Sequence, residues 1–270
     1  MLDQELSINV YQAIARLRKP REIKMWHSSS IAKCPRSLYF ERLKVPALNV
    51  PTAAKEIRFE SGHSVETALR KPLKELYPDL KSNVRLRNKK LDLTGEYDNI
   101  VPSQKRLIEI KSVDIGAVIQ RNNVLSLKKE VGLDDRGRKL YEPMLEPYKH
   151  HIWQQESYCL LMETPGTEYF DVKKKEWLPL EPMTIEQIDY IYVTLRGQLV
   201  AYKTPRSPGI TKRVSDKVNY LNDALNGSKM PICMCSENQE FWKEQNQYCD
   251  YQSEGECCSP SLVNKLKEQK

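Results

Sequence analysis

The segment from Leu93 to Val113 reads LTGEYDNIVPSQKRLIEIKSV, and the fold follows from it. It contains two β-rich runs, separated by the polar and proline-containing segment Pro102–Lys105. Two such runs joined by a short turn are typical of a β-hairpin. We therefore expect strands over 93–101 and 106–113.

The second strand of this hairpin places its side chains alternately on two faces. Glu109 and Lys111 share one face, and Ile108 and Ile110 take the other, where they can enter a core. Asp98, at the end of the first strand, can come round beside Glu109. The hairpin therefore brings two carboxylates and a lysine together at the edge of a sheet.

These three side chains have a chemical use. Two carboxylates form a hard, oxygen-rich site for Mg²⁺ or Mn²⁺. Such an ion polarises a phosphodiester oxygen and acidifies a bound water, and a lysine can orient that water or stabilise developing negative charge. The alternative is an exposed hairpin with a surface salt bridge, and the rest of the chain decides between the two.

Length and composition indicate a cytosolic protein. The chain has 270 residues, of which 40% are hydrophobic, so a sizeable core is possible. It contains no apolar run of membrane length, and its N-terminus lacks a basic-then-apolar signal. The net charge is +7, and basic residues gather in several clusters, which permits a nucleic-acid partner without establishing one.

The chain has seven cysteines, and five of them fall within the last 38 residues. A reducing compartment argues against disulfides, so clustered cysteines point to metal. The C-terminal segment has almost no apolar content, and a metal centre could order it in place of a core. Three thiolates there and one from elsewhere would complete a Cys₄ site for Zn²⁺ or an iron–sulfur cluster. Unliganded surface thiols are the alternative.

Two helices are expected to flank the hairpin. One runs from about Ala54 to Tyr77, with an apolar stripe at four positions (Val65, Leu69, Leu73, Leu76) and Pro72 as a kink or break. His63 and Glu66 share a face of this helix. The other helix covers 149–163, where Gln154 and Tyr158 face the same way and Cys159 belongs to the core.

The remaining segments predict a less regular second half. Residues 114–147 are long, charged and weakly periodic, which indicates a flexible insertion that could form a flap or arch. A capping box at 184–187 opens a predicted helix to about residue 202, with an apolar stripe at Ile188, Ile191, Leu195 and Leu199. The predicted organisation is an N-terminal helix in 1–27, a core over 28–202, and a linker, short helix (216–225) and Cys-rich region over 203–270.

The order of these features resembles the RecB-like branch of the PD-(D/E)XK nuclease superfamily. Within it, the chain is most similar to the iron–sulfur exonucleases: the CRISPR-associated RecB-like exonucleases, their phage relatives and the AddB nuclease domain. The similarity rests on five motifs in order, from about Ser28 to Cys258: Cys34, Gly62-His63-Ser64-Val65-Glu66, Gly95-Glu96-Tyr97-Asp98, Glu109-Ile110-Lys111 and Gln154-x-x-x-Tyr158, followed by the C-terminal cysteines.

The resemblance implies an α/β fold with a restriction-endonuclease-like core, in which helices flank a mixed central sheet. It implies that Mg²⁺ or Mn²⁺ is held by Glu66, Asp98, Glu109 and the Ile110 carbonyl. Glu66 stands where many members of the family carry a histidine, and His63 is the alternate ligand. Lys111 would position the attacking water, while Gln154 and Tyr158 would orient the scissile strand or the lysine.

The resemblance also implies a structural [4Fe–4S] cluster that joins the N-terminal and C-terminal segments, with Zn²⁺ as the alternative metal. The expected ligands are Cys34, Cys235, Cys249 and Cys257, with Cys233 and Cys258 as alternates. The usual C-terminal Cys-x-x-Cys is missing, because Asn246 stands three residues before Cys249. Cys233 or Cys235 would supply that ligand instead.

The function expected from these motifs is a metal-dependent DNA exonuclease acting on single-stranded ends in the cytoplasm of a bacterium, as a bacterial or phage-encoded protein. Proteins of recombination, replication or CRISPR adaptation are the expected partners, and no membrane is involved. Two alternatives stay open. One is an endonuclease on branched or flap DNA that uses the same residues, and the other is a non-catalytic DNA-binding adaptor.

Overall fold

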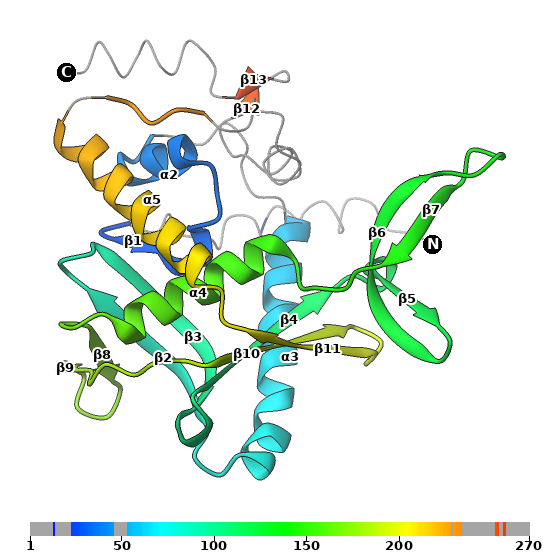
Figure 1. Cartoon of the computed structure of the whole chain (residues 1–270), viewed down its shortest axis with the longest axis horizontal. Helices are drawn as coiled ribbons and strands as arrows, with labels where there is room; N and C mark the ends of the chain where they lie inside the picture. Colours follow the sequence, from blue (N-terminus) through cyan, green and yellow to red (C-terminus); the bar gives the residue numbers. More distant parts are fainter. Residues whose placement is uncertain are drawn as a thin grey trace.

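The computed structural model describes residue 13 and residues 23–45, 53–227, 229–233, 252–253 and 256–257. Within this part of the chain the centre is an eight-stranded mixed sheet (Figure 1). Its strands are β1 (Trp26–His27), β2 (Lys81–Asn88), β3 (Leu93–Val101), β4 (Arg106–Val113), β8 (Glu168–Asp171), β9 (Glu176–Pro179), β10 (Gln187–Thr194) and β11 (Leu199–Pro205). The order is β11-β10-β4-β3-β2-β8-β9, with β1 beside β3.

The four described helices of regular length are α2 (Pro35–Arg42), α3 (Ala53–Leu76), α4 (Lys149–Glu163) and α5 (Pro208–Gly227). Helix α4 packs on β2 and β3, α5 packs on α4, and α3 packs on β4 (Figure 1). The predicted fold class, a mixed central sheet flanked by helices, is therefore confirmed.

The central hairpin forms as its sequence predicts. Strands β3 and β4 have the expected bounds, and the turn between them is a short 3₁₀ helix, η2 (Pro102–Gln104). Lys105 ends this turn in the left-handed conformation, with φ of 50°. The turn signals are local, so the short segment itself determines the structure.

The two faces of β4 belong to two separate cores. Ile108 and Ile110 pack with Leu73 of α3 in one hydrophobic cluster, while Leu107 belongs to the larger cluster under α4. This alternation agrees with the predicted faces of the strand. Helix α3 is continuous through Pro72, so the proline does not split it. Its apolar stripe ends one turn earlier than predicted, because Leu76 is 70% exposed.

Residues 184–202 do not form the predicted helix. They form β10 and the start of β11, an antiparallel hairpin whose first strand also pairs in parallel with β4. Leu195, which the helical stripe would bury, is 73% exposed, whereas Tyr190 and Tyr192 are buried. The segment alternates in strand fashion, and pairing with β4 outweighs the local helical signals.

Residues 114–147 are also more regular than the predicted flexible insertion. They contain η3 (Ile115–Ala117) and three antiparallel strands: β5 (Val118–Arg121), β6 (Val124–Leu133) and β7 (Lys139–Pro143). The β6–β7 hairpin projects away from the central sheet, as an arm (Figure 1). The arm is inserted between β4 and α4, the two elements that carry most of the predicted site.

Two segments at the borders of the predicted core also differ locally from the prediction. The described end of the segment 1–27 includes the strand β1, which pairs with β3. The rest of this segment, where the N-terminal helix is predicted, lies outside the described residues apart from the helical residue 13. The predicted linker over 203–213 is occupied by the end of β11 and the first turns of α5, which begins at Pro208. No helix in the described ranges is both long enough and apolar enough to cross a membrane.

Candidate active site

Strands β3 and β4 separate at the position of Asp98 and Glu109. Their ladder consists of the pairs Asn99↔Ile108, Ile100↔Leu107 and Val101↔Arg106. Beyond it, the backbone N–H of Ile110 donates to Oδ2 of Asp98 at 2.9 Å. If β3 and β4 stayed paired, the Ile110 N–H would bond to a backbone carbonyl of β3. Here it bonds to the Asp98 side chain instead. On its other side β4 stays paired with β10, so the opening lies between β3 and β4.

The ladder between β2 and β3 is also interrupted at Asp98. The pairs Ser82↔Asn99 and Val84↔Tyr97 form, but Asn83 and Asp98 between them do not pair. Asn83 has φ of 54°, a left-handed conformation that is uncommon for residues other than glycine. Irregularities of this kind re-aim side chains and recur next to active sites. Asp98 is therefore released from regular strand geometry on both sides.

Glu109 is the buried carboxylate of the site, with 1% of its surface exposed. Its Oε2 accepts a hydrogen bond from Nε2 of Gln155 on α4, and its Oε1 forms an ion pair with Nζ of Lys111. The pKa of Glu109 is raised to about 8, chiefly by burial and also by the negative charge of Asp98, against the opposing effect of Lys111. Sequence reasoning missed Gln155, although it follows the predicted Gln154 directly.

Lys111 lies two residues further along the same face of β4. Burial by itself lowers the pKa of its ammonium group, but the carboxylates of Glu109 and Asp98 outweigh burial, and the pKa is raised. The lysine therefore stays charged at neutral pH. It is a hydrogen-bond donor and a positive charge in the opening between the strands.

Glu66 reaches the same opening from α3. Burial raises the pKa of Glu66, and the negative charge of Asp98 raises it as well, while Lys111 and His63 lower it. Its Oε2 lies 3.4 Å from Nδ1 of His63, one turn earlier on the helix. The side chain of His63 is 55% exposed, compared with 19% for Glu66. Glu66 is thus the better placed of the two predicted ligands.

The chemistry of this group fits a hard divalent cation. Asp98 raises the pKa of both Glu66 and Glu109, because three negative charges gather here and Lys111 offsets them only in part. Carboxylate oxygens are the ligands that Mg²⁺ and Mn²⁺ prefer. In the side-chain orientations of the described residues, no three His, Cys, Asp or Glu side chains surround a common point. Gln155 holds Oε2 of Glu109, so a bound ion would take Oε1, the oxygen that pairs with Lys111 here.

Gln154 and Tyr158 lie one turn apart on α4 and bond to each other. Nε2 of Gln154 donates to the Tyr158 hydroxyl at 3.0 Å, and both side chains are buried. Burial raises the pKa of Tyr158 well above its usual range, and Glu109 and Asp98 raise it further. The prediction that Gln154 orients Lys111 stays a prediction, because it is Gln155 that contacts the partner of the lysine.

Gly95, the glycine of the Gly-Glu-Tyr-Asp motif, makes room for Tyr158. A Cβ atom at this position would stand 2.5 Å from Cε1 of Tyr158 and 2.6 Å from Oγ of Ser28. Both distances are too short for non-bonded contact, so a larger residue would displace the tyrosine or the serine. Glycine is required here for close approach of α4 to β3.

Two histidines at the start of α4 complete the surroundings of Lys111. Nδ1 of His151 lies 2.9 Å from the Tyr192 hydroxyl, and Tyr192 stands opposite Lys111 on β10. The pKa of His150 is lowered to about 4, chiefly by burial and also by the charge of Lys111. Burial, His150 and Lys111 hold the pKa of His151 well below its usual range. Sequence reasoning missed this pair, because the strand that carries Tyr192 was predicted as a helix.

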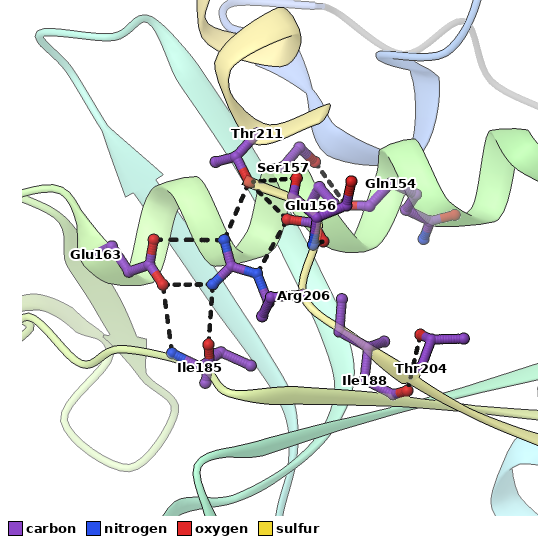
Figure 2. Close-up of polar contacts among 10 residues, drawn as sticks. Gln154, Glu156, Ser157, Glu163, Ile185, Ile188, Thr204, Arg206 and Thr211 are labelled. Carbon is purple, nitrogen blue, oxygen red and sulfur yellow. Dashed lines mark hydrogen bonds and ion pairs between the residues drawn. The ribbon is translucent and has the colours of Figure 1, made fainter. Parts of the chain in front are cut away.

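A buried ion network fixes α4 in place (Figure 2). Nε of Arg206 bonds Oε2 of Glu156 at 3.0 Å, and its Nη1 pairs with Glu163. Thr211 of α5 donates to the same Oε2 of Glu156 at 2.6 Å, and the Ser207 N–H donates to Oε1 at 2.6 Å. The network joins the helix that carries Gln154, Gln155 and Tyr158 to the start of α5. Arg206 is therefore a structural residue rather than part of a basic linker.

The predicted cluster site lies mostly outside the described residues. Cys34 is buried directly before α2, and Nε of Arg36 donates to the Pro231 carbonyl at 2.7 Å. That contact brings the segment ending at Cys233 to the start of α2. The side chains of the other expected ligands and alternates (Cys235, Cys249, Cys257, Cys258) lie outside the described residues, so the cluster stays a prediction. Cys159 is buried in the core, as predicted.

Sequence comparison finds no family profile and no curated protein that matches this chain. Among solved structures, a phage-related exonuclease from Haemophilus somnus 129PT has 14% identity and a TM-score of 0.44, with 77% of this chain and 94% of that chain covered. The alkaline exonuclease LHK-Exo from Laribacter hongkongensis has 10% identity and a TM-score of 0.41, with 96% and 100% covered. SSO0001 has 15% identity and a TM-score of 0.42, with 81% and 87% covered.

Proposed function

We propose that this chain is a metal-dependent nuclease that hydrolyses phosphodiester bonds of DNA, with single-stranded ends as its substrate. The observation that supports this proposal is the meeting of Asp98, Glu109 and Lys111 where β3 and β4 separate. Glu66 adds a carboxylate from α3. The sequence motifs that resemble the RecB-like exonucleases support the same reaction.

In this proposal Glu66, Asp98, Glu109 and the Ile110 carbonyl hold Mg²⁺ or Mn²⁺, with His63 as the alternate to Glu66. An ion held there would supply Lewis-acid chemistry, polarising a phosphodiester oxygen and lowering the pKa of a water. The Ile110 N–H bonds to Asp98, so the peptide unit beside the proposed carbonyl ligand is fixed. Gln155 holds the Glu109 carboxylate against α4 and limits its rotation.

Lys111 acts in this proposal as a charged donor. Its raised pKa keeps the ammonium protonated, so the lysine orients the attacking water and stabilises negative charge on the phosphate oxygens. It does not remove a proton from the water. Tyr158 also stays protonated, and Gln154 holds it in a buried position next to Glu109 and Asp98. In this proposal the two residues orient the scissile strand or Lys111 through these neighbours.

The structural [4Fe–4S] cluster, with Zn²⁺ as its alternative, also remains a proposal. The contact of Arg36 with Pro231 supports it, because it holds a cysteine-containing C-terminal segment near Cys34. The test is the iron, acid-labile sulfide and zinc content of anaerobically purified protein and of Cys34→Ser. Iron and sulfide that fall in the variant support the cluster, zinc alone supports the alternative, and neither metal contradicts both.

Digestion of linear and circular single-stranded DNA with Mg²⁺ or Mn²⁺ tests the proposed activity. The wild type is compared with Lys111→Ala and with Lys105→Ala, a control in the exposed turn of the same hairpin. We expect loss of linear DNA only, abolished by Lys111→Ala and retained in the control. Cutting of circles would indicate the endonuclease, and tight DNA binding without cleavage in Mn²⁺ would indicate the non-catalytic adaptor.

A further inference from the structure

Two arginines of β2 stack on two aromatic side chains of the neighbouring strands. The guanidinium carbon of Arg85 lies 4.0 Å from the ring centre of Phe170 on β8, and that of Arg87 lies 4.1 Å from the ring centre of Trp177 on β9. The two rings meet edge to face, with their centres 5.4 Å apart. We call these four residues the Arg–aromatic strip.

The strip lies on the face of the sheet opposite to α4. Leu86, between the two arginines in sequence, is buried in the cluster under α4, so alternation places Arg85 and Arg87 on the other face. Helix α3 covers that other face at β4. Helix α3 does not cover the same face at Arg85 on β2 and the opposing Glu96 on β3, because both residues are exposed.

The Arg85 end of the strip is the end nearer to the candidate active site along the sheet. Glu96 of β3 lies opposite Arg85, and Asp98 is two residues further along β3, about 7 Å at the rise of a strand. From there the strip crosses β2, β8 and β9 and ends near the turn Lys173–Lys175, which joins the last two strands. Three strand spacings separate β3 from β9, about 14 Å in all.

Positive charge prevails along this surface. Exposed lysines add to the two arginines at Lys89 and in the Lys173–Lys175 turn, and the exposed Glu96 is the carboxylate at the β3 end. Glu168 is the central carboxylate, and it is already paired with Arg87 at 2.5 Å and with Lys89 at 3.6 Å. Asp171 accepts the backbone N–H groups of Lys173 and Lys174, which orders the turn. A polyanion would meet a surface with an excess of cations.

Arg85 differs from Arg87 in a way that favours ligand binding. Arg87 is stacked and ion-paired, which a purely structural role explains. Arg85 is stacked and exposed, and within the described part of the chain no carboxylate pairs with it. Stacking fixes the guanidinium plane and leaves its edge N–H groups as donors, so little conformational entropy is lost when they bind a phosphate. Arg85 is thus ordered in advance for an anionic ligand.

We propose that the Arg–aromatic strip and the Lys173–Lys175 turn bind the phosphate backbone of the DNA strand that enters the candidate active site. This inference rests on the proposed nuclease function and adds the path of the substrate. The 14 Å from β3 to β9 corresponds to about four nucleotides of a strand stacked as in a duplex, at a rise of about 3.4 Å each. Shorter oligonucleotides therefore lose the contacts at the lysine turn.

Fluorescence anisotropy with an end-labelled single strand of about 20 nucleotides tests the path in a Lys111→Ala parent, in which cleavage is blocked. Into this parent are introduced Arg85→Ala, Arg85→Lys or the triple change of Lys173, Lys174 and Lys175 to alanine. The matched control replaces three basic residues on β11 and α5 by alanine: Lys203, Lys212 and Arg213. Circular dichroism and thermal unfolding show whether each variant folds.

We expect Arg85→Ala and the triple lysine change each to weaken DNA binding about tenfold, with Arg85→Lys between Arg85→Ala and the parent. The slope of log affinity against log salt should fall by about 0.7 for each phosphate contact removed, and the control should keep the parent's slope. If the folded strip variants bind DNA as tightly as the control variant, the proposed substrate path is wrong, while the nuclease proposal is unaffected. A parent that binds no DNA contradicts the nuclease function as well.

Discussion

Gln155 on α4 donates a hydrogen bond from Nε2 to the buried Oε2 of Glu109 on β4. This contact ties the helix that borders the candidate site to the strand that carries its central carboxylate. The other oxygen of Glu109 meets Lys111, so the orientation of the carboxylate depends on both neighbours. Gln155, the residue after Gln154 of the sequence motif, therefore orients Glu109 from α4.

Replacement of Gln155 by leucine should lower the turnover rate of DNA cleavage about 10- to 100-fold. A hydrogen bond to a charged group contributes about 1.5–3 kcal/mol, and its loss frees Glu109 to rotate. Steady-state cleavage of a linear single strand measures the effect. Gln187→Leu, which removes an amide bonded to Asp189 on β10, serves as the control. Activity of Gln155→Leu within twofold of the wild type would contradict this role.

The stability of the metal-free protein should decrease as the pH rises from about 4.5 to about 8 because of Glu109. The pKa of this carboxyl is raised from 4.5 to about 8 in the fold, so in that window the folded protein retains a proton that the unfolded chain has lost. The free energy of unfolding therefore falls with rising pH. Thermal unfolding in chelator at both ends of the window measures it. Glu109→Gln should show a smaller fall, and an equal fall in both proteins would refute the assignment.

Gly95→Ala should destabilise the protein by about 1–3 kcal/mol and reduce cleavage, because its Cβ would stand 2.5 Å from Tyr158. Urea unfolding gives the change in free energy. Gly209→Ala, where a Cβ meets nothing within 4 Å, is the matched substitution and should leave stability unchanged or slightly raised. If the two variants unfold at the same urea concentration, the close approach of α4 to β3 is not a constraint.

Removal of the Arg206 side chain should cost about 3–5 kcal/mol, because the fully buried Glu156 then loses its cationic partner. Arg206→Met keeps most of the volume and isolates the effect of charge. The exposed pair Lys105–Glu186 provides the comparison, and Lys105→Ala should cost no more than about 1 kcal/mol. Chemical denaturation of both variants decides the matter, and similar losses would argue against a structural role of the network.

The hairpin and helix α4 could be predicted from sequence because their signals are local. Alternation, turn residues and helical spacing act within a few residues, and they place Glu109, Lys111 and Gln154 on the correct elements. The position of Asp98 beside Glu109 also follows from strand pairing. The interruption at Asn83 that releases Asp98 has no comparable sequence signal.

The helix prediction for residues 184–202 was wrong because the segment contains two competing local patterns. Its capping box and the spacing of Ile188, Ile191 and Leu195 fit a helix, while the alternation that buries Tyr190 and Tyr192 fits a strand. The outcome depends on pairing with β4, about 80 residues earlier, which no local window contains. The same pairing places Tyr192 opposite Lys111, and Tyr192 contacts His151. These neighbours of Lys111 were missed for the same reason.

Binding of Mn²⁺ to the protein without DNA, measured by electron paramagnetic resonance, tests the central claim most directly. We expect the wild type to bind Mn²⁺, and Asp98→Asn and Glu109→Gln to bind it at least about tenfold more weakly, because each loses a charged ligand. Asp134→Asn, in the projecting arm, removes a carboxylate paired with Arg138 and should bind like the wild type. Unchanged Mn²⁺ affinity in Asp98→Asn and Glu109→Gln would contradict a metal site at the opening between β3 and β4.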